Sequence, residues 1–178
     1  RITQAATKEE AMRLLAEEQK QGTLELLMTS PLRDWEIVLG KYLASLGVFA
    51  AMVALTAGYP VLLTVLGNPD VGPMLSGYLG YLLLGAAMLA IGVLASSLTQ
   101  NQIVAAVLGI GANLLLWVAG DLGDLVGDRL RAVVEYLPPF AHYFDFARGI
   151  IDTKDVVYFL SVIVLFLFLS TRMVESRR

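Results

Sequence analysis

A stretch of 79 residues, from Tyr42 to Gly120, contains a single formal charge, at Asp70. A helix on the surface of a soluble protein needs a polar face, and this stretch does not supply one. Lipid is the solvent that accepts apolar residues over such a length. Only 16% of the whole chain is charged, whereas soluble domains carry about 25% charged residues. The sequence therefore predicts an all-α, polytopic integral membrane protein.

Turn residues divide the apolar part of the chain into four predicted transmembrane helices. The dividing segments are residues 67–70, 99–102 and 121–155. Pro60 predicts a kink in the first span, because its nitrogen has no hydrogen to donate to the carbonyl of Thr56. The predicted transmembrane domain, residues 42–178, has spans at about residues 42–66, 74–98, 103–119 and 156–171.

The polar segment 121–155 has seven acidic and four basic residues and is divided by Pro138-Pro139. Apolar residues on either side of the prolines recur at helical spacing, which predicts two interfacial helices at about residues 125–137 and 140–151. We expect these two helices to form an extracytoplasmic hairpin. The acids Asp121, Asp124 and Asp128 lack the spacing of an EF-hand loop, so a solvated face is favoured over a calcium site.

Residues 1–41 are predicted to form a cytosolic juxtamembrane segment. Apolar residues at helical spacing are surrounded by acids up to Gly22, where the first helix is expected to end. Ser30 then provides an N-cap and Pro31 a first helical position for the helix that enters the membrane. The helix, the break at Gly22 and the restart at Ser30 together form what is called the elbow below. On pattern alone, an amphipathic elbow that lies on lipid headgroups is slightly favoured over an elbow with a more specific role in the cytosol.

The distribution of Lys and Arg predicts the orientation. Four spans place both ends of the chain and the 99–102 turn on one side, which then carries nine basic residues against four on the other side. Because cytoplasmic loops are enriched in Lys and Arg, both ends are predicted to be cytoplasmic.

Small residues repeat at four-residue spacing in the second and third predicted spans. Such residues let helices approach closely, and packing within the subunit is favoured over a dimer seam. A polar amide deep in a span is expected to hydrogen-bond a neighbouring helix rather than a substrate. The predicted helix-packing residues are Ala86, Ala90, Gly92, Ala105, Gly109 and Asn113.

Several kinds of chemistry are disfavoured. The chain has no Cys and a single His, so no metal site is predicted. His142, Asp145 and Arg148 lie close in sequence, but with no evident nucleophile they are interpreted as interfacial packing residues with polar tips. An intramembrane enzyme needs polar groups at depth, which the spans lack. No glycine-rich phosphate loop occurs, and the net charge of −3 gives no reason to expect nucleic acid.

Three separated stretches resemble the permeases of ABC-2 type ABC transporters, and in particular the gliding-motility-associated branch. The resemblance covers residues 12–178. Its first stretch combines an arginine, a pair of acids, a glycine-threonine step and a threonine-serine-proline step. The matching residues are Arg13, Glu17-Glu18, Gly22-Thr23-Leu24-Glu25, Thr29-Ser30-Pro31, Trp35 and Val38–Lys41, then Ala95–Gln102, and finally Phe144–Asp152, Asp155–Leu160 and Glu175–Arg178.

The resemblance implies a permease subunit in a bacterial or archaeal cytoplasmic membrane. The elbow would be a coupling helix seated on an ATP-binding subunit, and ATP and Mg²⁺ would be bound by that partner rather than by this chain. A second permease subunit, identical or different, would complete the membrane part. Two further spans would precede the elbow in the family, and residues 1–11 contain neither, so the four predicted spans would be the last four of six. The substrate stays open, and a non-transporting scaffold in a motility or secretion complex is the alternative. The implied coupling residues are Glu17, Glu18, Gly22, Thr23, Glu25 and Thr29.

Overall fold

The computed structural model describes residues 33–119 and 136–176, and all regular structure within them is helical. The all-α prediction is therefore confirmed for these residues. Residues 1–37 and 38–178 form two compact units, and the packing described below lies within the second. Three helical stretches are long and apolar enough to cross a membrane: Asp34–Leu66, Val71–Leu98 and Thr153–Glu175. The remaining predicted span corresponds to a shorter apolar helix, Gln102–Val118.

The first stretch consists of α2 (Asp34–Thr56) and α3 (Gly58–Leu66). At its start the N–H of Arg33 donates to the Oε2 of Glu36 at 2.8 Å, which satisfies one of the donors that a helix start leaves open. The predicted cap at Ser30 and Pro31 lies outside the described residues. The stretch has 33 residues, or about 50 Å of helix against a hydrocarbon core of about 30 Å.

The helix is interrupted at Ala57, between α2 and α3. Pro60 lacks an N–H, so the carbonyl of Thr56 loses its usual donor. The hydroxyl of Tyr78, in the next helix, donates to this carbonyl at 2.9 Å. A side chain from the neighbouring helix thus satisfies the acceptor that the proline leaves open.

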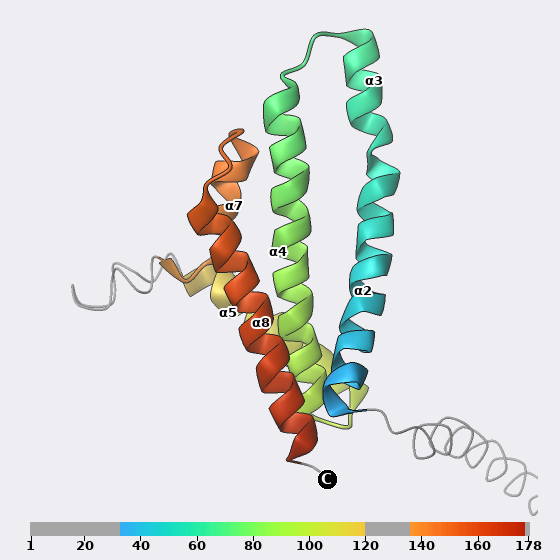
Figure 1. Ribbon diagram of the computed structural model, residues 1–178, viewed down its shortest axis with the longest axis vertical. Helices are drawn as coiled ribbons and strands as arrows, with labels where there is room; N and C mark the ends of the chain where they lie inside the picture. Colours follow the sequence, from blue (N-terminus) through green and yellow to red (C-terminus); the bar gives the residue numbers. More distant parts are fainter. Residues whose placement is uncertain (1–32, 120–135, 177–178) are drawn as a thin grey trace, which may run out of the picture. The chain divides into compact units, whose positions relative to one another are not determined.

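Helix α4 (Val71–Leu98) lies between α2–α3 and α8 (Thr153–Glu175) (Figure 1). It runs antiparallel to α2, since Lys41 bonds Ser96 near its end and Thr56 bonds Tyr78 near its start. It runs in the same direction as α8. Two buried clusters between α4 and α8 show this direction. One joins Leu84 to Phe159, and the other, further along both helices, joins Val93 to residues 166–174.

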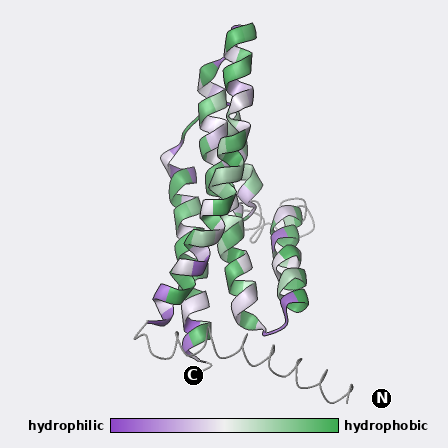
Figure 2. Cartoon of the chain, turned by 90° about the vertical axis from the view of Figure 1, so that its right-hand side faces the viewer, coloured by the Kyte–Doolittle hydropathy of each residue, from purple (hydrophilic) through white to green (hydrophobic). Residues whose placement is uncertain are grey.

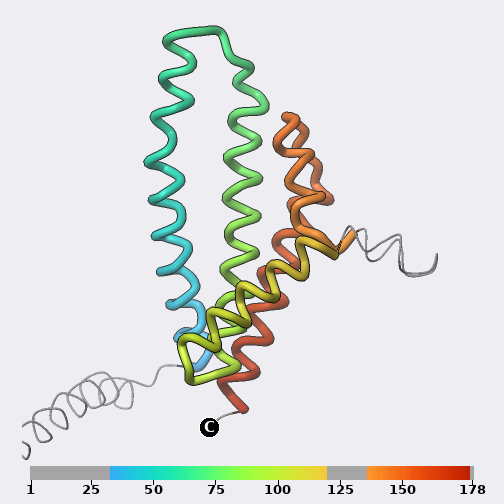
Figure 3. The backbone as a smooth tube through the Cα atoms, turned by 180° about the vertical axis from the view of Figure 1, so that it is seen from behind, coloured from blue at the N-terminus to red at the C-terminus, as the bar shows by residue number. Residues whose placement is uncertain are grey.

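Helix α5 (Gln102–Val118) crosses α4 obliquely (Figure 3). Its N-cap is Asn101, whose side-chain oxygen accepts from the N–H groups of Ile103 and Val104. The cap explains why the chain turns sharply after α4 and begins a new helix at once.

Helix α7 (Pro139–Ala147) packs against α4 and ends four residues earlier than the predicted helix 140–151. Gly149 has a φ of 88°, a conformation that favours glycine. The N–H of Ile150 donates to the Asp145 carbonyl at 2.9 Å and the N–H of Gly149 to the Phe146 carbonyl at 3.0 Å. This is a Schellman cap, which stops the helix. The other predicted interfacial helix, 125–137, falls almost entirely outside the described residues.

Large apolar side chains remain exposed along the helices. Leu55, Val65 and Ile103 are 84%, 77% and 75% exposed. Figure 2 shows hydrophobic residues along most of the length of the long helices. A soluble protein does not expose apolar surface on this scale, whereas the lipid-facing surface of a membrane protein does.

Candidate functional site

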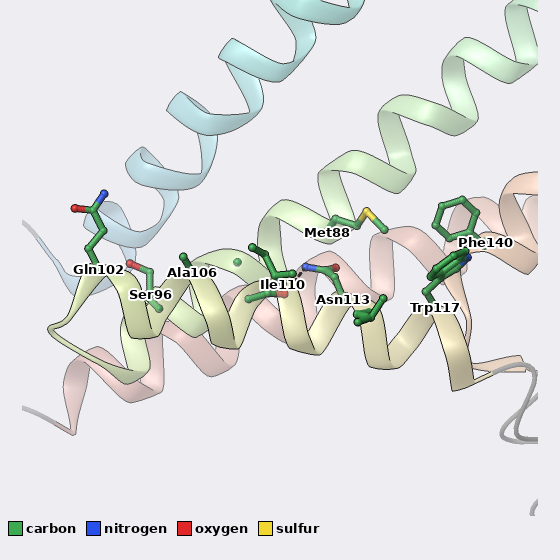
Figure 4. A pocket seen from close by; sticks show the side chains of 12 residues that line it. Met88, Ser96, Gln102, Ala106, Ile110, Asn113, Trp117 and Phe140 are labelled. Atoms are coloured by element: carbon green, nitrogen blue, oxygen red, sulfur yellow. Dashed lines mark hydrogen bonds between the residues drawn. The ribbon is translucent and has the colours of Figure 1, made fainter.

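An open groove of about 750 Å³ lies between α4 and α5 (Figure 4). Among the described residues no charged side chain lines it, and its polar groups are few. Its size falls within the range of small-molecule sites, about 300–1,000 Å³. The lining residues are Met88, Gly92, Ser96, Gln102, Ala105, Ala106, Gly109, Ile110, Asn113, Leu114, Trp117 and Phe140.

The two ends of the groove differ in chemistry. At one end Ser96 accepts a hydrogen bond from the ammonium group of Lys41, at 2.8 Å. At the other end the rings of Trp117 and Phe140 are in contact, with centroids 6.1 Å apart. The groove therefore joins a polar end, at Ser96 and Gln102, to an aromatic end through an apolar middle.

The predicted glycines have different roles in this groove. A Cβ on Gly109 would lie 3.6 Å from both the Cβ of Ala95 and the Cα of Gly92, so α5 approaches α4 here. A Cβ on Gly92 would meet nothing within 4 Å. Gly109 thus lies at the helix contact, whereas Gly92 leaves space in the groove.

The other predicted packing residues divide between two places. Ala86 and Ala90 are buried in α4, where the carbonyl of Ala86 accepts from the hydroxyl of Tyr42 at 3.2 Å. Ala105 is half-buried in the groove. The expectation for Asn113 is wrong: its amide nitrogen donates to the carbonyl of Gly109 in its own helix, at 2.9 Å. The carbonyl four residues earlier is the acceptor closest to hand, and the amide bonds it instead of a neighbouring helix.

A second polar feature, the His142–Asp155 pair, lies where α7 meets the start of α8. The Nδ1 of His142 is 2.6 Å from the Oδ1 of Asp155, and these side chains are 6% and 1% exposed. The sequence had placed His142 beside Asp145 and Arg148 as a packing residue with a polar tip. The structure instead pairs it with an acid 13 residues later.

The start of α8 carries a further acid, Asp152, which caps the helix. Its Oδ1 accepts from the N–H of Lys154 at 3.0 Å, and its Oδ2 lies 3.2 Å from the Lys154 ammonium. The backbone hydrogen bond, followed by the side-chain contact, holds the pKa of Asp152 below its usual range. Both residues are exposed, so this cap is a surface feature, unlike the buried Asp155 beside it.

Two packing glycines were not predicted. A Cβ on Gly80 would lie 2.5 Å from the Cβ of Phe146 in α7, and one on Gly85 would overlap the ring of Phe49 in α2. Gly80 follows Ser76 by four residues, the same spacing of small residues that drew attention to the second half of α4. The same pattern of small residues is thus present in the first half of α4 as well as in its second half.

The six predicted coupling residues lie outside the described residues, as do Asp121, Asp124 and Asp128. These residues are Glu17, Glu18, Gly22, Thr23, Glu25 and Thr29.

Comparison with known proteins identifies the family. Residues 11–175 match the family described as ABC-2 family transporter protein. The chain belongs to the ABC-2 transporter family. Members of this family are membrane permeases, and the apolar helices agree with an integral membrane protein.

Individual relatives match over part of the chain. The "Probable multidrug ABC transporter permease YbhR" of Escherichia coli K12 is 33% identical over 90 residues, which make up 49% of this chain and 23% of that protein. The corresponding protein of Escherichia coli O157:H7 matches equally. The chain thus aligns with about a quarter of the length of these relatives. No solved structure matches it.

Proposed function

We propose that this chain is the permease subunit of an ABC-2 transporter and couples ATP hydrolysis by a partner ATPase to the movement of a substrate across the membrane. The observation that carries the proposal is the family match, which extends over residues 11–175. Three apolar helices of spanning length support it. ATP and Mg²⁺ would be bound by the partner ATPase, and a second permease subunit would complete the membrane part.

The proposed topology has four crossings, with α5 contributing to the third. Since α4 and α8 run in the same direction, the chain must return across the structure between them, through α5 and α7. Helix α5 alone has 17 residues, about 25 Å of helix. Val38 and Val174 pack in one cluster, so the chain returns to the end from which it entered. The excess of Lys and Arg on that side favours the cytoplasmic face of a bacterial or archaeal inner membrane.

The coupling is proposed to reach the membrane through α2. This helix begins at Asp34, directly after the predicted coupling segment. A helix continuous with a contact on the ATPase converts movement of that contact into tilt. Residues 38–66, called the arm below, carry the movement in this proposal.

The substrate is proposed to be an apolar or amphiphilic organic molecule that occupies the α4–α5 groove. The groove has an apolar middle and, in the described part of the chain, no charged lining residue, which disfavours a small ion. The relative from Escherichia coli K12 is named as a multidrug permease, which agrees with such a substrate class. The finer resemblance to gliding-motility permeases supports the same permease role without specifying a cargo.

The test is to reconstitute the full-length protein with its candidate ATPase and measure ATP hydrolysis. We expect the permease to raise hydrolysis several-fold, and Glu18→Ala and Gly22→Ala to lower this stimulation. Glu10→Ala, an acid outside the predicted coupling residues, is the matched control and should leave it unchanged. Hydrolysis that responds neither to the permease nor to these substitutions would favour a non-transporting scaffold and contradict the proposal.

A further inference from the structure

The His142–Asp155 pair makes the one side-chain hydrogen bond between α7 and α8 within the part of the chain that the structure describes. His142 lies in the middle of α7 and Asp155 in the first turn of α8. Both side chains are buried, and the distance of 2.6 Å between Nδ1 and Oδ1 is that of a strong, charge-assisted hydrogen bond. A buried pair of this kind is expensive to separate, because each partner would be left without its counterpart.

The geometry fixes where protons must lie. The Nε2 of His142 is 3.0 Å from the carbonyl oxygen of Tyr136, which can only accept, so Nε2 carries a hydrogen. Nδ1 faces the carboxyl oxygen of Asp155, so one proton must also lie between these two atoms. The arrangement therefore requires one proton more than a neutral imidazole beside an ionised carboxylate can provide.

The surroundings favour an imidazolium beside a carboxylate. The ring of Tyr158 stacks on the imidazole, with centroids 3.9 Å apart and planes inclined by 22°, and the Tyr136 ring meets it edge-on at 4.7 Å. An aromatic face attracts a cation. Asp155 lies in the first turn of α8, where the helix dipole favours a negative charge.

Among residues 33–119 and 136–176, few other ionisable groups face the pair. On α8 these are Lys154, which is exposed, and Tyr158, whose hydroxyl donates to the Leu137 carbonyl. On the α7 side they are Tyr136 and Asp145. Helices α4 and α5 contain no Asp, Glu, Lys, Arg or His at all. The charge of the pair itself therefore dominates this buried region.

We propose that the His142–Asp155 pair is a proton-binding site that holds α7 against α8 while it carries its proton. Loss of the proton to water turns the imidazolium into a neutral imidazole, and the pair changes from neutral to a net charge of −1. Oδ2 of Asp155 is also buried and has no hydrogen-bond donor among the described residues. The neutral imidazole can donate either to Asp155 or to the Tyr136 carbonyl but not to both, and the buried carboxylate is left without its cation. The contact between α7 and α8 is therefore weakened and admits water.

The test uses nitrogen NMR of ¹⁵N-histidine-labelled full-length protein in lipid nanodiscs, together with hydrogen exchange of the α7 amides. His142 is the single histidine of this chain, and subtracting the spectrum of His142→Gln isolates its signals from any others. While the pair holds its proton, we expect both ring nitrogens to carry hydrogen. As the pH rises until one hydrogen is lost, the α7 amides should exchange about tenfold faster after correction for the intrinsic rate.

Asp155→Asn should leave one ring nitrogen without hydrogen under conditions where the parent carries both, and give the fast exchange there. Asp145→Asn removes a nearby acid of α7 that makes no hydrogen bond or ion pair with His142 or Asp155 in the described part of the chain, and should behave as the parent does. A neutral imidazole at all pH values, or α7 exchange that does not follow the loss of the proton in the unsubstituted protein, would overturn the proposal. The measurement needs neither ATPase nor substrate, so its outcome is independent of the proposed transport function.

Discussion

Helix α4 holds its neighbours by different means on its two sides. Toward α7 the helices approach closely: Gly80 has no room for a Cβ beside the side chain of Phe146, and the hydroxyl of Ser76 donates to the Phe146 carbonyl at 2.7 Å. Toward the arm, long side chains span the distance, with Tyr42 and Tyr78 bonding backbone carbonyls of the opposite helix. The first kind of contact fixes helix positions closely, while the second can adapt by side-chain rotation.

Burial follows the same division. In the most apolar window of each stretch, 44% of residues are buried in α4, 11% in α8 and 6% in α2–α3. Elements with few buried contacts open at low free-energy cost. Helix α8 is nevertheless joined to α4 and α7 through the fully buried Phe159. We therefore propose that the arm moves over α4, whereas α4, α7 and α8, called the core below, form the fixed part.

The largest expected effect comes from Gly80→Ala in the core. The new Cβ would lie 2.5 Å from the Cβ of Phe146, an atom that cannot move without its backbone. We expect the free energy of unfolding to fall by about 1–3 kcal/mol, as for other overpacked sites. Thermal unfolding in detergent micelles measures it. Gly92→Ala, with nothing within 4 Å, is the control and should be neutral or slightly stabilising; equal effects of the two substitutions would refute the rigid contact.

A smaller effect is expected from Gly85→Ala on the arm side. The overlapping atoms belong to the far edge of the Phe49 ring, which is half-buried and can rotate. The loss should stay below about 1 kcal/mol, because the side chain moves instead of the helix. Combining it with Phe49→Leu should recover the loss in the same unfolding assay. If Gly85→Ala is as costly as Gly80→Ala, the two sides of α4 are not different in kind.

The smallest effect expected is that of Tyr78→Phe, which removes the donor to the carbonyl that Pro60 leaves open. One such hydrogen bond contributes about 0.5–1.5 kcal/mol. Pro60→Ala restores a backbone N–H to Thr56, so Tyr78→Phe should cost less in that background. A double-mutant cycle of unfolding free energies measures the coupling. Identical costs in both backgrounds would show that the tyrosine does not compensate for the proline.

The helices could be predicted from the sequence for two reasons. The charge-free stretch indicates helices surrounded by lipid, and turn residues mark where one helix ends and the next begins. Pro60 also identified the weak point of the first span. The end of α7 was missed, although Gly149 lies within the predicted helix, since a helical pattern of apolar residues continues to Ile151. The helix nevertheless ends before Gly149, because the positive φ of this glycine is incompatible with a continuing α-helix.

The polar and packing contacts were harder to predict, because they join residues far apart in the chain. His142 has a nearby acid in Asp145, yet it bonds Asp155, which the turn after α7 returns to its side. Gly80 meets Phe146 across 66 positions. Spacing along one helix identifies small residues, but it does not say which of them meets a neighbouring backbone.

The most direct test of the account measures whether the arm moves over a fixed core during ATP hydrolysis. The chain has no native Cys, so pairs of spin labels can be introduced at exposed positions. Leu55→Cys with Leu75→Cys reports the α2–α4 distance, and Leu75→Cys with Leu160→Cys reports the α4–α8 distance. With the partner ATPase reconstituted, we predict that Mg-ATP shifts the first distance distribution and leaves the second unchanged. An unchanged α2–α4 distance, or a shift between α4 and α8, would contradict the account.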